Sequence, residues 1–404
     1  PANEFAVSIV LRADALTGED AGCTDETIAR LRHHGAIDVA ERLGPLLGKR
    51  LAFYFAMLFA TVRWLLSFGK RPRPSRCVWM YVVSIVYASA AASVALHVER
   101  MRELMAMLSP LAFSYRSPMY GAYELVRAGY LNSQGDFEEM TRVARERLPL
   151  AQSQRRLAPT EKKMAEAVWR FMLALCGMSY NDPDVLVQAD ALDALDLPLW
   201  RLSATMLRAT WHRHRGEEGL ARRQRAKAQT QLVELGGHAR LEAFEPVQQV
   251  IAALLARDLP SLRNTSERLE RFVDLGMGYQ GWLYLARGVL RRALGDLDGW
   301  ERLLAHGDAH GVPVVRPMVR VAQADLELAR GRHREAQLHA QAAIDMIGSR
   351  DMAFSNMRAR AQRSLALALM GLGDREGAAK LVAQLASRAK ELDHPALRAM
   401  ACGV

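Results

Sequence analysis

The sequence has little cysteine: four residues in 404, far apart and without a C-x-x-C or cysteine–histidine spacing. They are Cys23, Cys77, Cys176 and Cys402. Their spacing indicates neither a zinc site nor the disulfide framework of a small secreted domain. We therefore expect free, buried thiols in a protein of the reducing cytoplasm. Residues 1–20 also lack the basic start and apolar core of a signal peptide.

The motifs of common catalytic classes are lacking as well. The sequence contains neither the H-R-D nor the D-F-G motif of protein kinases, and no G-x-S-x-G nucleophile elbow. We therefore expect this chain to have no catalytic residues, no cofactor and no metal. The alternative is that it forms part of an ATP-dependent Ser/Thr kinase or ATPase whose motifs lie elsewhere.

Three near matches to functional motifs are weak. Gly276–Gly281 reads G-x-G-x-x-G, but an Arg/Glu-rich helical stretch precedes it where a dinucleotide fold needs a strand, so we predict an interhelical loop. Gly44–Arg50 resembles a P-loop, but its glycines are too close together and Arg stands where a Ser or Thr should bind Mg²⁺. His306 and His310 could share a metal on one helix face, but no third ligand follows from the spacing.

The charge is positive but not concentrated. The formal net charge is +10, from 54 Lys and Arg against 44 Asp and Glu. Most of the excess is Arg interspersed with Glu along expected helices, so it favours an acidic partner without forming a nucleic-acid site. We expect a protein or peptide partner and no nucleic acid.

What the sequence does contain is a repeated helical unit. Its apolar residues are mostly Leu, Ala, Val and Met, which favour helix. Turns recur about every 40 residues, near the length of a two-helix repeat. A Gly at such a turn can adopt positive φ and end the first helix, and a following Asp or Glu can accept from free N–H groups of the second. The turns are Gly135-Asp136, Asn181-Asp182, Gly216-Glu217, Arg257-Asp258, Gly295-Asp296, Gly331-Arg332 and Gly373-Asp374.

Two further positions keep the same register as the turns. Seven residues before each turn we expect a close helix crossing, and all but one of these residues are Ala or Gly: Ala128, Ala174, Ala209, Val250, Gly288, Ala324 and Ala366. Five residues after each turn stand apolar residues of the facing helix: Met140, Leu186, Ala221, Leu262, Trp300, Ala336 and Ala378. This shared phase predicts a repeat array.

Residues 101–404 resemble tetratricopeptide repeats on this pattern of a small residue, a Gly-Asp turn and an Ala at fixed offsets. They lack the family's aromatic at the eleventh position and its terminal Pro, so the copies are divergent. The resemblance implies an all-α fold, a right-handed α-solenoid of tetratricopeptide-like helix-turn-helix repeats. The clearest copies are Gly288…Gly295-Asp296, Ala324…Gly331…Ala336 and Ala366…Gly373-Asp374…Ala378.

Two stretches resemble a narrower class. Leu192–Trp200, continuing to Arg215-Gly216-Glu217, and Leu259–Leu262 are similar to the C-terminal helical arrays of large bacterial signalling proteins. Those proteins carry a Ser/Thr kinase and a signal-transduction ATPase upstream. The resemblance implies that this chain is the sensor end of such a regulatory protein.

Residues 1–100 show no clear repeat, so we expect a separate N-terminal helical region before an array over 101–404. It contains two apolar helices, 51–68 and 77–96, with a basic connector between them. We expect these helices to be buried between neighbours. A membrane contact through 51–96, and with it a membrane-anchored scaffold, is the alternative.

The first helix of each repeat lines the concave face of such a solenoid, where extended partners bind. Arg213, His214, Arg292 and Arg363 fall on or beside this face and could form a mildly basic strip for an acidic peptide. The alternative is that these arginines are simply solvated. Trp200, Trp211, Trp282 and Trp300 are expected to be core anchors rather than a ligand cage. We therefore expect a non-catalytic protein-interaction or sensor array, in which each repeat contacts only its neighbours.

Overall fold

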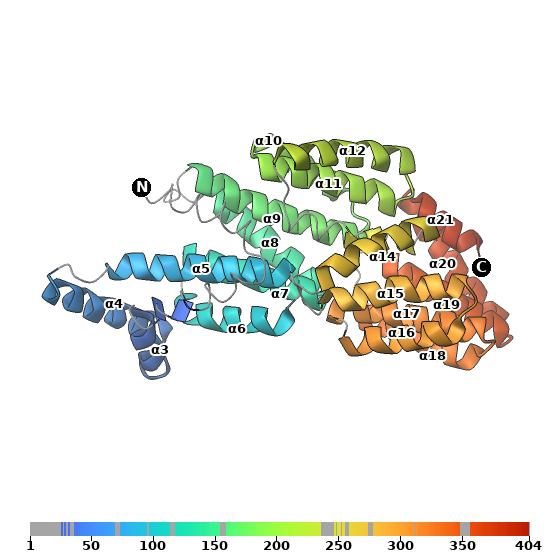
Figure 1. The fold of residues 1–404 in the computed structure, drawn as a ribbon, viewed down its shortest axis with the longest axis horizontal. Helices are drawn as coiled ribbons and strands as arrows, with labels where there is room; N and C mark the ends of the chain where they lie inside the picture. Colours follow the sequence, from blue (N-terminus) through green and yellow to red (C-terminus); the bar gives the residue numbers. More distant parts are fainter. Residues whose placement is uncertain are drawn as a thin grey trace. The chain divides into compact units, whose positions relative to one another are not determined.

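In the computed structural model the described residues are mostly helical and include no strand (Figure 1). Their packing divides the chain into two compact units, residues 1–133 and 134–404. The expected boundary at residue 100 falls inside the first unit. The described residues are 26, 28–29, 31–32, 36–68, 73–94, 97–113, 118–153, 159–235, 246–247, 249–251, 253–254, 258–273, 278–310, 312–347 and 356–403.

The first unit packs its helices around one apolar cluster that includes Tyr81, Ile85, Met101 and Leu104. The two apolar helices predicted from the sequence are present as α4 and α5. None of the described helices combines the length and the apolarity needed to cross a membrane. The helices are α3 (Ala36–Leu47), α4 (Lys49–Leu66), α5 (Pro74–Val94), α6 (Val98–Leu108), the 3-10 helix η1 (Ser109–Leu111) and α7 (Pro118–Gln134).

The expectation that both apolar helices are buried is wrong for α4. Its buried residues are Ala52, Phe53 and Ala56, on one face, while most of its other apolar side chains are exposed. The Phe53 ring packs against Phe113, with 5.1 Å between centroids. Apolar composition alone did not distinguish a core helix from one with a single packed face.

The second unit is a solenoid-like row in which consecutive helices pack against each other from α8 to α12 and again from α14 to α21. This confirms the predicted all-α array. Its helices are α8 (Phe137–Ser153), α9 (Pro159–Tyr180), α10 (Asp184–Ala194), α11 (Pro198–His214), α12 (Glu218–Glu234), α14 (Leu259–Val273), α15 (Gly278–Ala293), α16 (Leu297–His310), the 3-10 helix η2 (Pro313–Val315), α17 (Arg316–Ala329), α18 (His333–Ile347), α19 (Asn356–Gly371), α20 (Arg375–Glu391) and α21 (Pro395–Cys402).

The predicted turns are confirmed wherever the structure describes them. Their first residues have positive φ, for example 72° at Gly135 and 86° at Gly373, and Asn181 takes the same conformation at 57°. The second residue closes the turn: the Asp296 N–H donates to the Arg291 carbonyl oxygen at 3.0 Å. Its carboxylate then accepts from Gly299 N at 2.8 Å, which caps the next helix. Of the Arg257-Asp258 turn, Arg257 lies outside the described residues.

The predicted small-residue crossings are also present. Ala128, Ala174 and Ala324 are fully buried. A Cβ on Gly288 would lie 2.7 Å from Cδ1 of Trp300, the facing residue of the same repeat, so the two helices approach closely because Gly288 has no side chain. Ala209 and Leu186 are only partly buried. The four tryptophans expected in the core, Trp200, Trp211, Trp282 and Trp300, are all buried.

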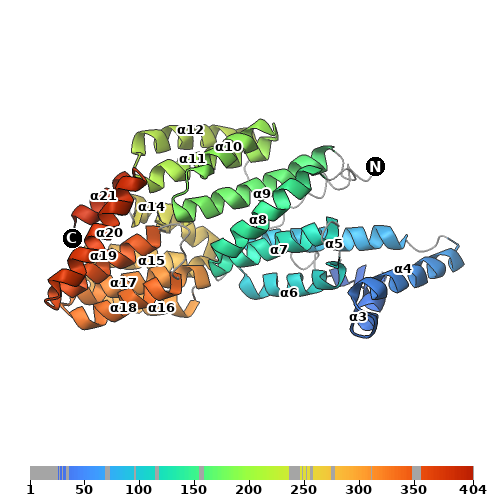
Figure 2. The ribbon, with the colours of Figure 1, turned by 180° about the vertical axis from the view of Figure 1, so that it is seen from behind.

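The C-terminal end of the array departs from the expectation that each repeat contacts only its neighbours. Pro395 begins α21, where its missing N–H costs nothing. In both views α21 lies beside α11 and α12, helices from much earlier in the chain (Figures 1 and 2). The array therefore folds back on itself within the second unit.

Candidate ligand-binding site

The predicted basic strip is built from residues that already have partners within the protein. Nη2 of Arg213 donates to Oγ of Ser261 at 2.9 Å, and Nη1 of Arg292 lies 3.1 Å from the Asp325 carboxylate. Nη2 of Arg363 donates to the Gly403 carbonyl oxygen at 3.1 Å. The acceptors belong to three separate parts of the array. His214, at the end of α11, is buried. The strip stays a prediction, and its guanidinium groups contribute to holding helices together.

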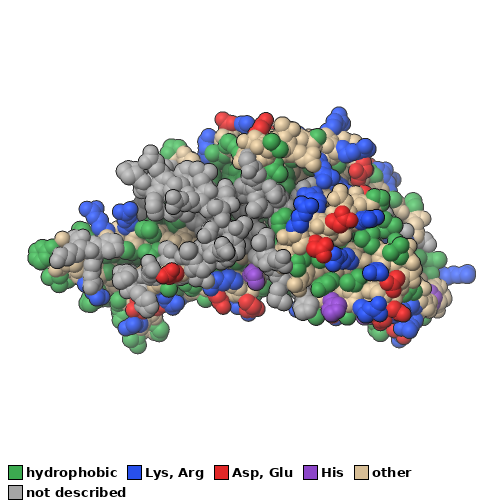
Figure 3. Space-filling view, in the orientation of Figure 1, with side chains coloured by type: hydrophobic (Ala, Val, Ile, Leu, Met, Phe, Trp, Pro, Cys, Tyr) green, Lys and Arg blue, Asp and Glu red, His purple; other side chains and the backbone are tan. Residues whose placement is uncertain are grey.

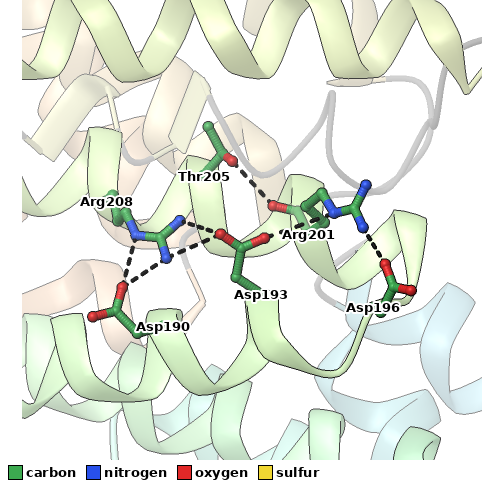
Figure 4. Close-up of polar contacts among 6 residues, drawn as sticks. All are labelled: Asp190, Asp193, Asp196, Arg201, Thr205 and Arg208. Atoms are coloured by element: carbon green, nitrogen blue, oxygen red, sulfur yellow. Dashed lines mark hydrogen bonds and ion pairs between the residues drawn. The ribbon is translucent and has the colours of Figure 1, made fainter.

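The stretch around Leu192–Trp200 also has an internal structural role. Here the carboxylates of α10 and the turn after it face two arginines of α11 (Figure 4). The Arg208 guanidinium lies 2.7 Å from the Asp190 carboxylate and 3.3 Å from that of Asp193. Arg201 pairs with Asp196 and approaches Asp193 to 3.7 Å. These ion pairs fix α10 against α11.

A buried polar cluster forms where the array folds back. Nδ2 of Asn181 donates to Oδ1 of Asn356 at 3.0 Å, and Nε2 of His394 lies 3.2 Å from Oδ1 of Asn181. All three residues are buried, and His394 is fully enclosed. The Leu397 N–H donates to Nδ1 of His394 at 3.4 Å, so we assign the proton of the neutral ring to Nε2. Nε2 then donates a hydrogen bond to Oδ1 of Asn181.

Arg215 makes the second set of contacts across this junction. It follows α11, and its guanidinium donates to the carbonyl oxygens of Leu392 (3.1 Å) and Asp393. In return, the Ala396 N–H donates to the Arg215 carbonyl oxygen at 3.3 Å. Its Nε also lies 2.8 Å from Glu217. We call the contacts made by Asn181, Arg215, Asn356 and residues 392–397 the seam.

Protonation states at the seam follow from its enclosure. Burial, reinforced by the positive charge of Arg215, lowers the pKa of His394 to about 4, so the ring is neutral at pH 7. Burial opposes ionisation of Glu217, but hydrogen bonds from Arg215 and His212 outweigh it and lower the pKa of that carboxyl. The seam thus combines a neutral imidazole with a paired carboxylate.

A pocket of about 290 Å³ opens at the seam. Helices α8 and α9 and the start of α10 form most of its wall, and α20 supplies Arg388. A Cβ on Gly177 would lie 2.8 Å from a methyl group of Val185, so α9 and α10 meet closely behind this wall. The pocket is therefore lined by both ends of the array.

Two arginines and two aspartates supply the charge of the pocket, namely Arg145, Arg388, Asp182 and Asp184. The aspartates are engaged locally. Oδ1 of Asp182 accepts from Asp184 N, and Oδ2 of Asp184 accepts from Gln188 Nε2, each at 3.0 Å. Arg145 is exposed, and Arg388 is partly exposed and pairs with Glu391 at 2.7 Å. The arginines are thus more accessible to a ligand than the carboxylates.

The thiol in this pocket is unsuited to nucleophilic chemistry. Burial raises the pKa of Cys176 to about 12, so the thiol stays protonated at neutral pH. Cys77 is likewise buried and free, whereas Cys402 is exposed, which corrects the expectation of a buried thiol there; Cys23 lies outside the described residues. The described residues include no group of three His, Cys, Asp or Glu side chains placed to hold a metal.

The near-match motifs lie in helical surroundings. Gly278–Gly281 forms the first turn of α15, with Gly276 and Met277 outside the described residues, so this part of the motif is helix rather than the predicted loop. Gly44–Leu47 ends α3, and no strand precedes it among the described residues. His306 and His310 both lie on the helix α16.

Sequence reasoning missed the seam. Asn181 was identified as a turn residue, but its partner His394 is 213 positions away and follows no periodicity. No protein-family model matches this chain, and a search of curated proteins finds no match either.

Proposed function

We propose that the second unit is a non-catalytic protein-interaction and sensor array that regulates an attached or associated signalling effector, a kinase or an ATPase. The observation that carries this proposal is the pocket at the seam, which is lined by α8–α10 and by α20. A ligand seated there contacts both ends of the array at once.

Such a ligand would bind the closed array better than an array opened at the seam. It would then shift the population toward the closed form by its differential affinity for the two states. The effector would respond to the position of the C-terminal helices, which closure fixes. This is the physical basis of sensing in the proposal.

The ligand class follows from the accessible charges of the pocket. Arg145 and Arg388 present guanidinium groups at its wall, and guanidinium binds carboxylates with paired hydrogen bonds. A volume of about 290 Å³ suits one or two side chains rather than a cofactor. We therefore propose an acidic peptide segment of a protein partner as the occupant, in the cytoplasm.

The proposal is tested by fluorescence anisotropy of the full chain with labelled Glu-rich and Lys-rich peptides. The Glu-rich peptide should bind, and R388E and R145E should each weaken it by about tenfold. The matched control is R334E, the same charge reversal on an exposed residue of α18. Equal loss in all three variants would show that only net charge matters and would overturn the pocket assignment.

A second measurement tests the absence of catalysis. Purified chain incubated with ATP should release no phosphate above the rate of a heat-denatured control. Turnover that persists through purification and scales with protein concentration would favour the alternative, a kinase or ATPase segment, over a binding array.

A further inference from the structure

The exposed face of α4 is a continuous apolar stripe in the first unit. Leu51, Phe55, Leu58, Val62 and Leu65 recur every three or four residues and therefore share one side of the helix. They are 47–62% exposed. Figure 3 shows hydrophobic side chains gathered over α4. Such an extended apolar surface marks an interaction site.

The stripe is not the core face of the helix. Ala52, Phe53 and Ala56 lie on the opposite side and are packed against the rest of the unit. The rest of the unit therefore packs against one side of α4 at these residues, and the side that carries the stripe is exposed. A flat partner that accepts a whole helix face fits this arrangement.

The charge around the stripe has one sign. Between residues 42 and 98 there is no Asp or Glu. By the helical spacing of about 100° per residue, Arg50 and Arg63 lie to either side of the stripe, toward the packed face of the helix. The Arg73 guanidinium lies 5.5 Å over the Trp64 ring, which brings the start of α5 to the C-terminal half of α4. The basic residues of this segment are Arg42, Lys49, Arg50, Arg63, Lys70, Arg71, Arg73 and Arg76.

The aromatic residues add a second signature. Tyr54 and Phe59 are more than half exposed at the edges of the stripe, and Phe68 beyond the helix is 94% exposed. Aromatic side chains beside cations are typical of helices that lie in the membrane interface, with the apolar side in the acyl region and the cations among the headgroups. A second copy of the chain fits less well, since a two-fold contact through α4 would bring two such cationic segments together.

We propose that α4 is a peripheral membrane-binding helix that lies in the plane of a bilayer containing anionic lipids. The apolar stripe enters the acyl boundary, and the flanking arginines contact the lipid phosphates. The packed face with Ala52 and Phe53 keeps α4 attached to its unit, so the protein is held at the surface through one side of this helix.

The test is vesicle flotation of the full chain. The chain should float with vesicles of phosphatidylcholine containing about one third phosphatidylglycerol, and at least about fivefold less with phosphatidylcholine alone. High salt should reduce flotation with the anionic vesicles. Equal flotation with both vesicle types, or flotation with neither, overturns the proposal.

Two pairs of variants locate the binding surface. L58E should abolish flotation, whereas V187E, which places Glu at a similarly exposed apolar position of α10, should leave it unchanged. R63E should reduce flotation several-fold, and R334E should not. Circular dichroism melting of each variant checks that it folds like the parent.

Light scattering of the free chain tests the competing occupant of the stripe, which is a second copy of the chain. If the parent is a dimer, L58E makes it a monomer and vesicle binding is absent, then α4 is an interface between copies and the membrane proposal is wrong. A parent whose mass is unchanged by L58E, together with loss of flotation in L58E but not in V187E, supports the membrane surface.

Discussion

Helices α4 and α17 are both rich in apolar residues, but they are used in opposite ways. In α17, Met318, Val321 and Ala324 are buried between the preceding and following helices of the array. In α4, burial is limited to one narrow face, and large side chains such as Phe55 are exposed. Whether an apolar residue is buried therefore depends on its position in the repeat array rather than on how apolar its helix is. Within the array, small residues determine where the helices cross.

The largest expected effect comes from placing the same bulky side chain in both helices. Ala324→Trp fills a fully buried crossing in α17 and should lower the free energy of unfolding by about 1–3 kcal/mol or more. Leu58→Trp, on the exposed stripe of α4, should change it by less than about 0.5 kcal/mol. Urea unfolding of both variants measures the contrast. An Ala324→Trp protein as stable as the parent would show that the repeat register is wrong.

The second expected effect is a pH dependence of the free energy of unfolding, which His394 gives to the seam and which an ordinary turn lacks. The pKa of His394 falls from 6.5 in the unfolded chain to about 4 in the folded one, mainly through burial. The unfolded chain therefore takes up this proton at higher pH, and the folded state loses up to about 3 kcal/mol of stability as pH falls from 6.5 to 4. Chemical denaturation across this range measures the slope.

The matched variant for this measurement is His394→Asn, which keeps a side-chain acceptor for the N-terminus of α21 but cannot titrate. Its stability should fall less steeply with acid than that of the parent. Parallel profiles for the two proteins would mean that His394 is not enclosed and that the seam is open in solution.

The smallest effect concerns the turns that define the repeat. Gly373 and Gly219 both have open space where a Cβ would stand, but only Gly373 has positive φ, at 86°. Gly373→Ala should cost about 1–2 kcal/mol, because an L residue is strained there. Gly219→Ala, in the first turn of α12, should be neutral or slightly stabilising. Thermal melting measures the change in melting temperature of both variants. Equal changes would contradict the special role of the turn at Gly373.

The array was predictable because its signals are local and repeated. Each Gly-Asp turn specifies a chain reversal within a few residues, and the small residue seven positions earlier marks where the paired helices cross. The four tryptophans could also be assigned to the core. These features depend on neighbours in sequence, which periodicity reports directly.

The pocket and the seam could not be predicted on the same grounds. They arise where α20 and α21 meet helices from the beginning of the array, and the contact of Asn181 with His394 joins residues 213 positions apart. The proposed strip of Arg213, Arg292 and Arg363 came from position on an ideal solenoid. In the structure these arginines are hydrogen-bonded or ion-paired to nearby helices and termini.

A double-mutant cycle between Asn181 and His394 tests the closure of the array most directly. The two side chains are in contact only if the last helices fold back onto the first. We predict that Asn181→Ala and His394→Ala each destabilise the chain, and that the double variant loses at least about 0.5 kcal/mol less than the sum of the single losses. Strictly additive losses in urea unfolding would contradict the closed array and the sensing mechanism built on it.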